Sequence, residues 1–144
     1  MVKIQLRILS FMLAFSLFLF TACNTEKAKP SKYAISVDYS INKTSRYSIV
    51  ITDKYNTIVI PESVSEFNSN DKYILVKQLG MKRMYPDNIN NAYTIPDETK
   101  VYYWIIEKTT STVLGPFDIN EYEKAKDERK IPNLKLNDVH DYVN

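Results

Sequence analysis

The chain has 144 residues, with 19 basic and 17 acidic side chains and a formal net charge of +2. Without Lys3 and Arg7, which precede Cys23, the basic residues also number 17, and this balance gives no indication of nucleic-acid binding. A single cysteine excludes an intrachain disulfide, and a single histidine excludes a multi-histidine metal site. An apolar core must therefore supply the stability, and 11 Tyr, 6 Phe and one Trp provide large side chains for it.

The N-terminal residues 1–22 are predicted to be an export signal. Lys3 and Arg7 precede an uncharged, largely apolar run at residues 8–20. A transmembrane helix needs about 20 consecutive apolar residues, whereas this run is shorter and gives way to the polar residues 24–27. We therefore expect the segment to direct export and then to be removed.

A lipid-attachment site is predicted at Cys23. Residues 19–23, Leu-Phe-Thr-Ala-Cys, place two small residues before the cysteine and resemble the lipobox of bacterial lipoproteins. The resemblance implies that the thiol receives a diacylglycerol, that the signal is cut before Cys23 and that the new amino group is acylated. Because two or more acyl chains anchor a protein stably, we expect a lipid-anchored protein in the cell membrane or outer membrane, facing away from the cytoplasm. The alternative is an ordinary secretory signal cut near Ala22, which would leave a free thiol.

The rest of the chain is predicted to consist of a tether and one folded domain. Residues 23–31 are hydrophilic and contain Pro30, which is typical of a linker. Residues 32–144 have the length of a single domain. They contain only two glycines, so we expect left-handed turn positions to be filled largely by Asn and Asp.

Short strands are predicted through the first half of the domain. Residues 33–41 alternate apolar and polar side chains with a clear period of two. Further strands, separated by turns rich in Asn and Asp, are expected at residues 46–52, 57–60, 63–67 and 72–78. Spacings near ten residues favour an antiparallel meander.

Residues 79–100 interrupt this pattern. They contain Gly80, Pro86 and Pro96 and show no sustained periodicity, so we expect a long loop. Strands are predicted to follow at residues 101–107 and 112–114, and Gly115-Pro116 is expected to end the hairpin.

One helix is predicted at residues 118–130, near the C-terminus. Asp118 and Glu121 have the spacing of a capping box, and Pro132 is expected to stop the helix. The residues after Pro132 could form an extended tail or a last helical turn. The predicted fold class is α+β, with an antiparallel meander of about five to seven short strands and one C-terminal helix.

Several motifs in the second half carry a resemblance. They are residues 68–77, Tyr103-Trp-Ile-Ile106, Gly115-Pro116, Glu121-Tyr122 and Pro132. In this order they resemble a group of small bacterial lipoproteins with a domain of unknown function. The resemblance supports the fold and implies no substrate or cofactor.

No catalytic motif is found in the sequence. It has no Gly-rich phosphate loop, no nucleophile elbow and no Cys–His pair. His140 lies five residues from the C-terminus between Asp138 and Asp141, and we interpret it as a solvated tail residue rather than a catalytic or metal-binding one. The adjacent Asp97 and Glu98 are interpreted as a solvated turn rather than an acid–base pair.

Lys82, Arg83 and Tyr85 form the candidate contact site. Together with Met81 and Met84 they combine cations with adaptable apolar groups in the expected long loop. A partner with an acidic patch, or anionic lipid headgroups, would suit them. The alternative is a surface loop whose Met and Tyr side chains close over the sheet.

An aromatic run at residues 102–104 is assigned to core packing. Alternation places Tyr102 and Trp104 on one face of a strand and Tyr103 on the other, so at least one face is expected to be buried.

These observations favour a membrane-anchored lipoprotein that acts as a non-enzymatic binding or interaction module in the cell envelope. We expect no metal or cofactor, and as partners the lipid bilayer, through acylated Cys23, and an envelope protein. Two alternatives are an envelope hydrolase without a recognisable motif and an immunity or inhibitor lipoprotein.

Overall fold

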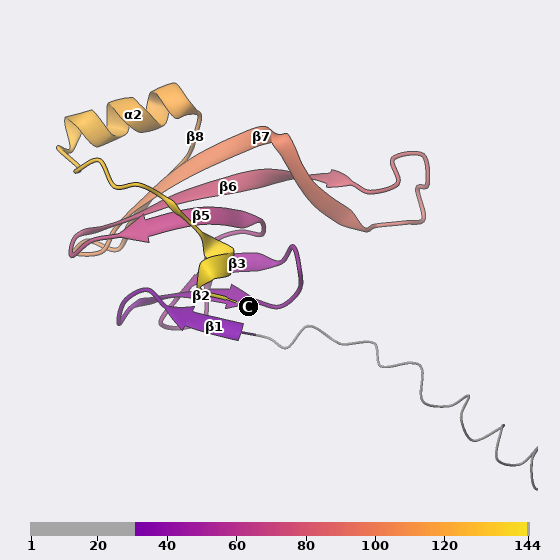
Figure 1. Ribbon diagram of the computed structural model, residues 1–144, viewed down its shortest axis with the longest axis horizontal. Helices are drawn as coiled ribbons and strands as arrows, with labels where there is room; N and C mark the ends of the chain where they lie inside the picture. The colour runs from indigo at the N-terminus through magenta and orange to yellow at the C-terminus, as the bar shows by residue number, and fades with distance from the viewer. Residues whose placement is uncertain (1–30, 144) are drawn as a thin grey trace, which may run out of the picture.

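A computed structural model describes residues 31–143 of the chain (Figure 1). The predicted export signal, Cys23 and tether residues 23–30 lie outside the described residues. Within residues 31–143, nine strands form two antiparallel sheets, accompanied by one α-helix and one 3₁₀ turn. The α+β class, the meander and the C-terminal helix are therefore confirmed.

Sheet A contains the first four strands in sequence order. They are β1 (Ser31–Ala34), β2 (Tyr39–Lys43), β3 (Ile49–Asp53) and β4 (Ile58–Ile60).

The prediction of one strand over residues 33–41 is wrong. The backbone N–H groups of Ile35 and Ser36 both donate to the carbonyl of Tyr39, which reverses the chain between β1 and β2. Val37, at the tip of this turn, points into solvent instead of the core. The alternating pattern thus runs through a turn that local periodicity cannot detect.

Sheet B contains the other five strands in the order β8-β7-β6-β5-β9. Their bounds are β5 (Val64–Ser69), β6 (Tyr73–Arg83), β7 (Thr94–Glu107), β8 (Thr112–Phe117) and β9 (Asn137–Asp138).

The predicted loop at residues 79–100 is also wrong, because β6 and β7 extend into it from both sides and leave only residues 84–93 between them. Pro96 lies in the part of β7 that pairs with β6 only. Backbone groups on the open edge need no strand partner, so a proline, which has no backbone N–H, is tolerated there.

Strand β8 continues through Gly115-Pro116 to Phe117, contrary to the expected end of the hairpin. The register shifts between Tyr103 and Ile105, and a Cβ on Gly115 would lie 2.7 Å from the carbonyl oxygen of Tyr103. With its φ of +122°, Gly115 therefore makes the bulge that lets the strand continue.

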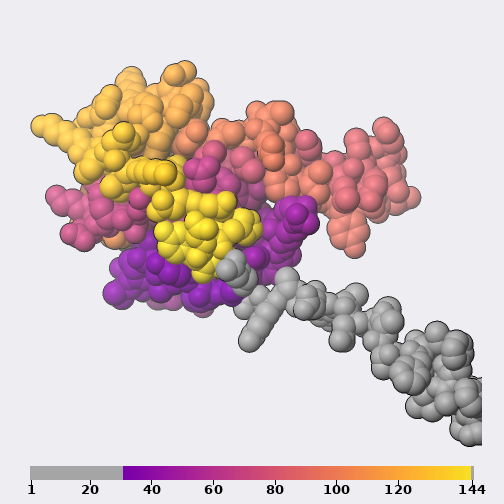
Figure 2. Space-filling view, viewed as in Figure 1, coloured from indigo at the N-terminus to yellow at the C-terminus, as the bar shows by residue number. Residues whose placement is uncertain are grey.

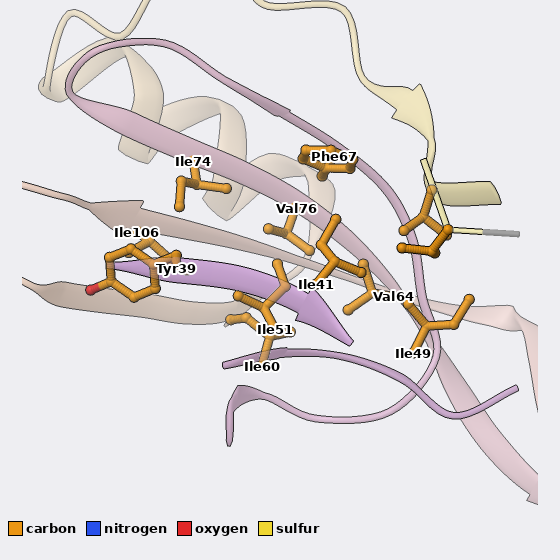
Figure 3. Close-up of a cluster of buried hydrophobic side chains, with 12 residues drawn as sticks. Tyr39, Ile41, Ile49, Ile51, Ile60, Val64, Phe67, Ile74, Val76 and Ile106 are labelled. Carbon is orange, nitrogen blue, oxygen red and sulfur yellow. The ribbon is translucent and has the colours of Figure 1, made fainter. Parts of the chain in front are cut away.

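Sheet B is the middle layer of three, with sheet A on one face and the helix on the other (Figure 1). The core between the two sheets is closely packed (Figure 3), and its labelled members are Tyr39, Ile41, Ile49, Ile51, Ile60, Val64, Phe67, Ile74, Val76 and Ile106. A second core on the helix side contains Leu75, Ile105, Tyr122, Ala125 and Ile131. Successive side chains of a strand point to opposite faces of the sheet, and both faces of β6 and β7 are buried. This explains why the apolar runs in these two strands are continuous.

Helix α2 (Ile119–Glu128) begins at the predicted capping box. The carboxylate of Asp118 accepts hydrogen bonds from the backbone N–H groups of Asn120 and Glu121, and the Glu121 side chain accepts from the N–H of Asp118. The ring of Tyr122 stacks on Tyr103 at a centroid distance of 4.7 Å. This contact confirms that Tyr103 serves core packing.

The C-terminal segment returns to the junction of the two sheets (Figure 2). Strand β9 pairs with β5, and the 3₁₀ turn η2 (Val139–Asp141) follows it directly. Val139 and Val143 are buried in the core between the sheets. The ring of Tyr142 lies 4.8 Å from that of Phe67. Both expected forms of the tail, extended and helical, are therefore present.

A buried polar contact joins the crossover between the sheets to β6 and β7. The side-chain amide of Gln78 donates to the carbonyls of Pro61 and Glu62, and its oxygen accepts from the indole N–H of Trp104 at 2.8 Å. All hydrogen-bonding groups of this buried amide are thereby satisfied, which avoids the cost of an unpaired polar group. Trp104 is thus also a packing residue.

Asn or Asp was expected at left-handed turn positions. Among residues 31–143, this holds for only one of the four non-glycine residues with a positive φ. These sites are Asn56, Ser63, Ser111 and Lys130. Asn and Asp act in the turns mainly as side-chain acceptors: Asp53 accepts from two backbone N–H groups, and Asn70 does the same.

The core between the sheets predicts a contrast between two isoleucines on paired strands. Ile51 is fully buried, whereas Ile58 is 59 % exposed. Ile51→Ala should lower the free energy of unfolding by about 2 to 5 kcal/mol, because it removes buried methyl groups and leaves a cavity. Ile58→Ala should change it by less than about 0.5 kcal/mol. Urea titrations followed by circular dichroism test this, and equal losses for the two variants would contradict the layered core.

Candidate functional site

The β6–β7 hairpin projects beyond the rest of sheet B. Strand β5 pairs with β6 only as far as Gln78, and β8 pairs with β7 only from Tyr103 onward. Past these points β6 and β7 have only each other. We call residues 80–97 the arm, and it stands out from the body in both the ribbon and the space-filling views (Figures 1 and 2).

The arm is set at an angle by a bulge at its base. Residues 98–100 bulge out of β7 opposite Gly80, which pairs with Asp97. A Cβ on Gly80 would lie 2.7 Å from the Cβ of Lys100, closer than two such atoms approach. Glycine therefore allows the bulged segment to pass close over β6.

Asp97 fixes the conformation of this bulge. Its carboxylate accepts hydrogen bonds from the hydroxyl of Thr99 at 2.7 Å and from the Thr99 backbone N–H at 3.2 Å. The ammonium of Lys82 lies 3.7 Å from the same oxygen. The Thr99 hydroxyl, with smaller contributions from the Thr99 N–H, Lys82 and Lys100, lowers the pKa of Asp97 against the opposing effect of burial. The interpretation of Asp97 as part of a solvated turn is therefore wrong, because its side chain is buried.

Four large apolar side chains are exposed at the tip of the arm. Met84 and Tyr85 are each 49 % exposed, Tyr93 is 74 % exposed and Ile89 is 82 % exposed. Scattered apolar residues on a surface are ordinary, whereas these four share one projecting segment.

Hydrogen bonds within the tip join its backbone groups to one another and to asparagine side chains. The N–H of Met84 donates to the carbonyl of Tyr93 at 2.9 Å, which closes the loop. The side chain of Asn88 accepts from the N–H of Asn90, and that of Asn91 accepts from the N–H of Tyr93. The tip therefore has an internal framework of polar bonds and presents its apolar groups to solvent.

The structure separates the predicted contact residues Lys82, Arg83 and Tyr85. Lys82 and Arg83 are neighbours on one strand, so their side chains leave opposite faces of the arm. Lys82 is paired with Asp97, and Tyr85 belongs to the exposed tip. The alternative of a loop closed over the sheet does not apply to Met84 and Tyr85, which are about half exposed.

Ile89 and Tyr93 also belong to this surface, although they were not among the predicted contact residues. The only available signal was the presence of large apolar residues in a segment otherwise rich in Asn and Pro.

A cleft of about 260 Å³ lies beside the base of the arm, and its polar lining consists of Arg46, Tyr47, Ser63, Ser65, Glu98, Asp138 and His140. The side chain of His140 is exposed, as expected, but the residue belongs to η2, where its N–H donates to Asp138. Among residues 31–143, no hydrogen bond or ion pair joins the side chains of Arg46, Glu98 and His140. Of the two serines, Ser65 donates its hydroxyl to the backbone carbonyl of Lys77, and no hydrogen bond among the described residues joins either hydroxyl to His140, Glu98 or Asp138.

A second hollow of about 440 Å³ lies at the C-terminal end of α2. Its lining includes Lys72, Arg129 and Lys130. The guanidinium of Arg129 donates to the carbonyl of Ala125 in the last turn of the helix. Cations at this end of a helix are explained by the unpaired carbonyls and the helix dipole.

Residues 31–143 contain no group of three or more His, Cys, Asp or Glu side chains arranged to hold a metal ion. They also contain no helix long and apolar enough to cross a membrane.

The base of the arm predicts a specific coupling between Gly80 and Lys100. Gly80→Ala should lower the free energy of unfolding by about 1 to 3 kcal/mol, because the added methyl group overlaps Lys100 and the bulge must move. Combining it with Lys100→Gly should recover most of this loss relative to Lys100→Gly alone, and a double-mutant cycle by urea unfolding measures the recovery. Additive effects of the two changes would show that the close approach does not matter.

Comparison with known families identifies a domain of unknown function over most of the described residues. The family described as "Protein of unknown function (DUF3997)" matches residues 36–140. No curated protein and no solved structure matches the chain. The matched region covers nearly all of the folded domain, and the chain belongs to this family of proteins of unknown function.

Proposed function

We propose that the protein is a membrane-anchored lipoprotein whose domain is a non-enzymatic binding module of the cell envelope, with the arm as its contact surface. The observation that carries the proposal is the group of four exposed apolar side chains at the tip of the arm. The anchor is supported by the charged and apolar segments before Cys23 and by the small residues that precede it.

The tip has the side-chain chemistry of a contact surface. Burying an exposed isoleucine such as Ile89 contributes about 1.5 to 3 kcal/mol. Tyr85 and Tyr93 combine a large apolar ring with a hydroxyl that can bond to a partner or to water. Because Asp97 and Gly80 hold the base and asparagines hold the tip, little conformational entropy would be lost on binding.

A hydrolytic function has less support. The cleft beside the arm contains Ser63, Ser65 and His140, but no hydrogen bond among the described residues joins a serine hydroxyl to a base there, as a nucleophile for acyl transfer would require. An inhibitory or immunity role remains a form of the same proposal, since it too would act through contact.

The anchor predicts that Cys23→Ser abolishes lipid attachment. Mass spectrometry of the wild-type protein should show a chain that begins at Cys23 and carries a diacylglycerol with or without a third acyl chain. The Cys23→Ser variant should lack this mass and leave the membrane fraction. A wild-type chain with an unmodified thiol would contradict the anchor and support an ordinary secretory signal.

The arm predicts position-dependent cross-linking in cells. A photo-reactive benzoylphenylalanine at Tyr85 should give adducts in the envelope, because this side chain is at the proposed contact surface. The same group at Tyr55, which is 77 % exposed in the β3–β4 turn, serves as the matched control. Equal adduct patterns at the two positions, or none at Tyr85, would exclude the arm as the contact surface.

A further inference from the structure

We infer that the surface contacted by the tip of the arm is the lipid bilayer to which Cys23 is anchored, so that the protein touches the membrane at two places. The inference rests on the proposed anchor and names the partner of the proposed contact surface.

The composition of the tip fits a membrane interface. Tyrosine side chains favour the headgroup region, where the ring meets the acyl chains and the hydroxyl remains hydrated. Ile89, the most exposed of the four apolar side chains, lies in the middle of the tip segment between the two tyrosines. The arm, residues 80–97, contains two cations, Lys82 and Arg83, and two carboxylates, Asp87 and Asp97, so no excess of negative charge opposes an anionic membrane surface.

The position of the anchor relative to the arm supports the same partner. Strand β1 points away from the arm, so the start of this strand is the end nearer to the arm (Figure 1). Residues 24–30 connect it to Cys23, and at most about 3.5 Å per residue the anchor lies within about 28 Å of Ser31. From Gly80 to Tyr85 the arm reaches about 17 Å along the strand direction. The extended length of the chain from Cys23 to Ser31 is at least as great as the reach of the arm, so Cys23 and the tip can meet the same bilayer.

The area of the tip favours a bilayer over a folded protein. A stable protein complex buries about 800 Å² on each partner. Four partly exposed side chains provide on the order of a few hundred Å². A second contact on an already anchored chain needs much less, since the anchor keeps the tip at a high effective concentration near the surface.

The experiment uses the chain from Cys23 onward, coupled through its only thiol to vesicles with a maleimide headgroup lipid. The vesicles contain equal parts of phosphatidylcholine and phosphatidylglycerol, with or without bromine on the acyl chains, which quenches tryptophan on contact. Ile89→Trp reports on the tip, Tyr55→Trp is the matched exposed control, and the wild type gives the background from Trp104.

Bromine should quench the added emission of Ile89→Trp and leave that of Tyr55→Trp unchanged. Introducing Tyr85→Asp and Tyr93→Asp into Ile89→Trp should restore the emission, because a carboxylate at each tyrosine position opposes insertion. Circular dichroism of each variant checks the fold. Emission from Ile89→Trp that bromine does not affect would overturn the inference.

The failure of this inference and that of the proposed function can be told apart. The coupling is chemical, so quenching does not depend on whether cells attach lipid to Cys23. If Ile89→Trp is not quenched but the cross-linker at Tyr85 captures a protein, the bilayer is excluded while the arm remains a contact surface. If mass spectrometry finds an unmodified thiol, the anchor is excluded whatever the vesicles show.

Discussion

The burial of β6 and β7 on both faces is the constraint on which the rest of the structure depends. Ile74, Val76 and Ile106 fill the core against sheet A, while Leu75 and Ile105 fill the core against the helix. The chain has one cysteine, so these two cores must stabilise the domain without an intrachain disulfide. Sheet A and the helix pack on opposite faces of this pair of strands, and the C-terminal segment pairs with β5 beside them.

The same pair of strands produces the arm where their neighbours end. Beyond Gln78 and before Tyr103, no other strand covers their edges, and the sequence changes from continuous apolar runs to lysine, proline and threonine. A free two-stranded ribbon is marginally stable in water. The bulge opposite Gly80 and the bonds of Asp97 supply local interactions at the base of the arm, where packing is lost.

Local signals predicted the elements whose causes are local. The helix at residues 118–130 was predicted from Asp118 and Glu121, which form the expected capping box. The arm was not predicted because Gly80, Pro86 and Pro96 are typical of loops. Whether a strand can contain glycine or proline depends on which strands lie beside it, and this is a property of the tertiary structure. Tyr85 was predicted to be a contact residue because cations and methionines surround it in the sequence. The exposure of Ile89 depends on how the tip folds.

The composition of the tip connects its stability with its proposed role. Ordering the backbone costs about 1 to 2 kcal/mol per residue, and a flexible loop would lose this freedom when it met a membrane. Residues 84–93 contain no glycine, and Asn88 and Asn91 bond to backbone N–H groups within the segment. Much of the entropy is therefore lost on folding, before contact. The short asparagine side chains bond to backbone N–H groups, while Tyr85, Ile89 and Tyr93 remain exposed. Once the chain is anchored, a weak additional contact is enough to keep the tip at the membrane.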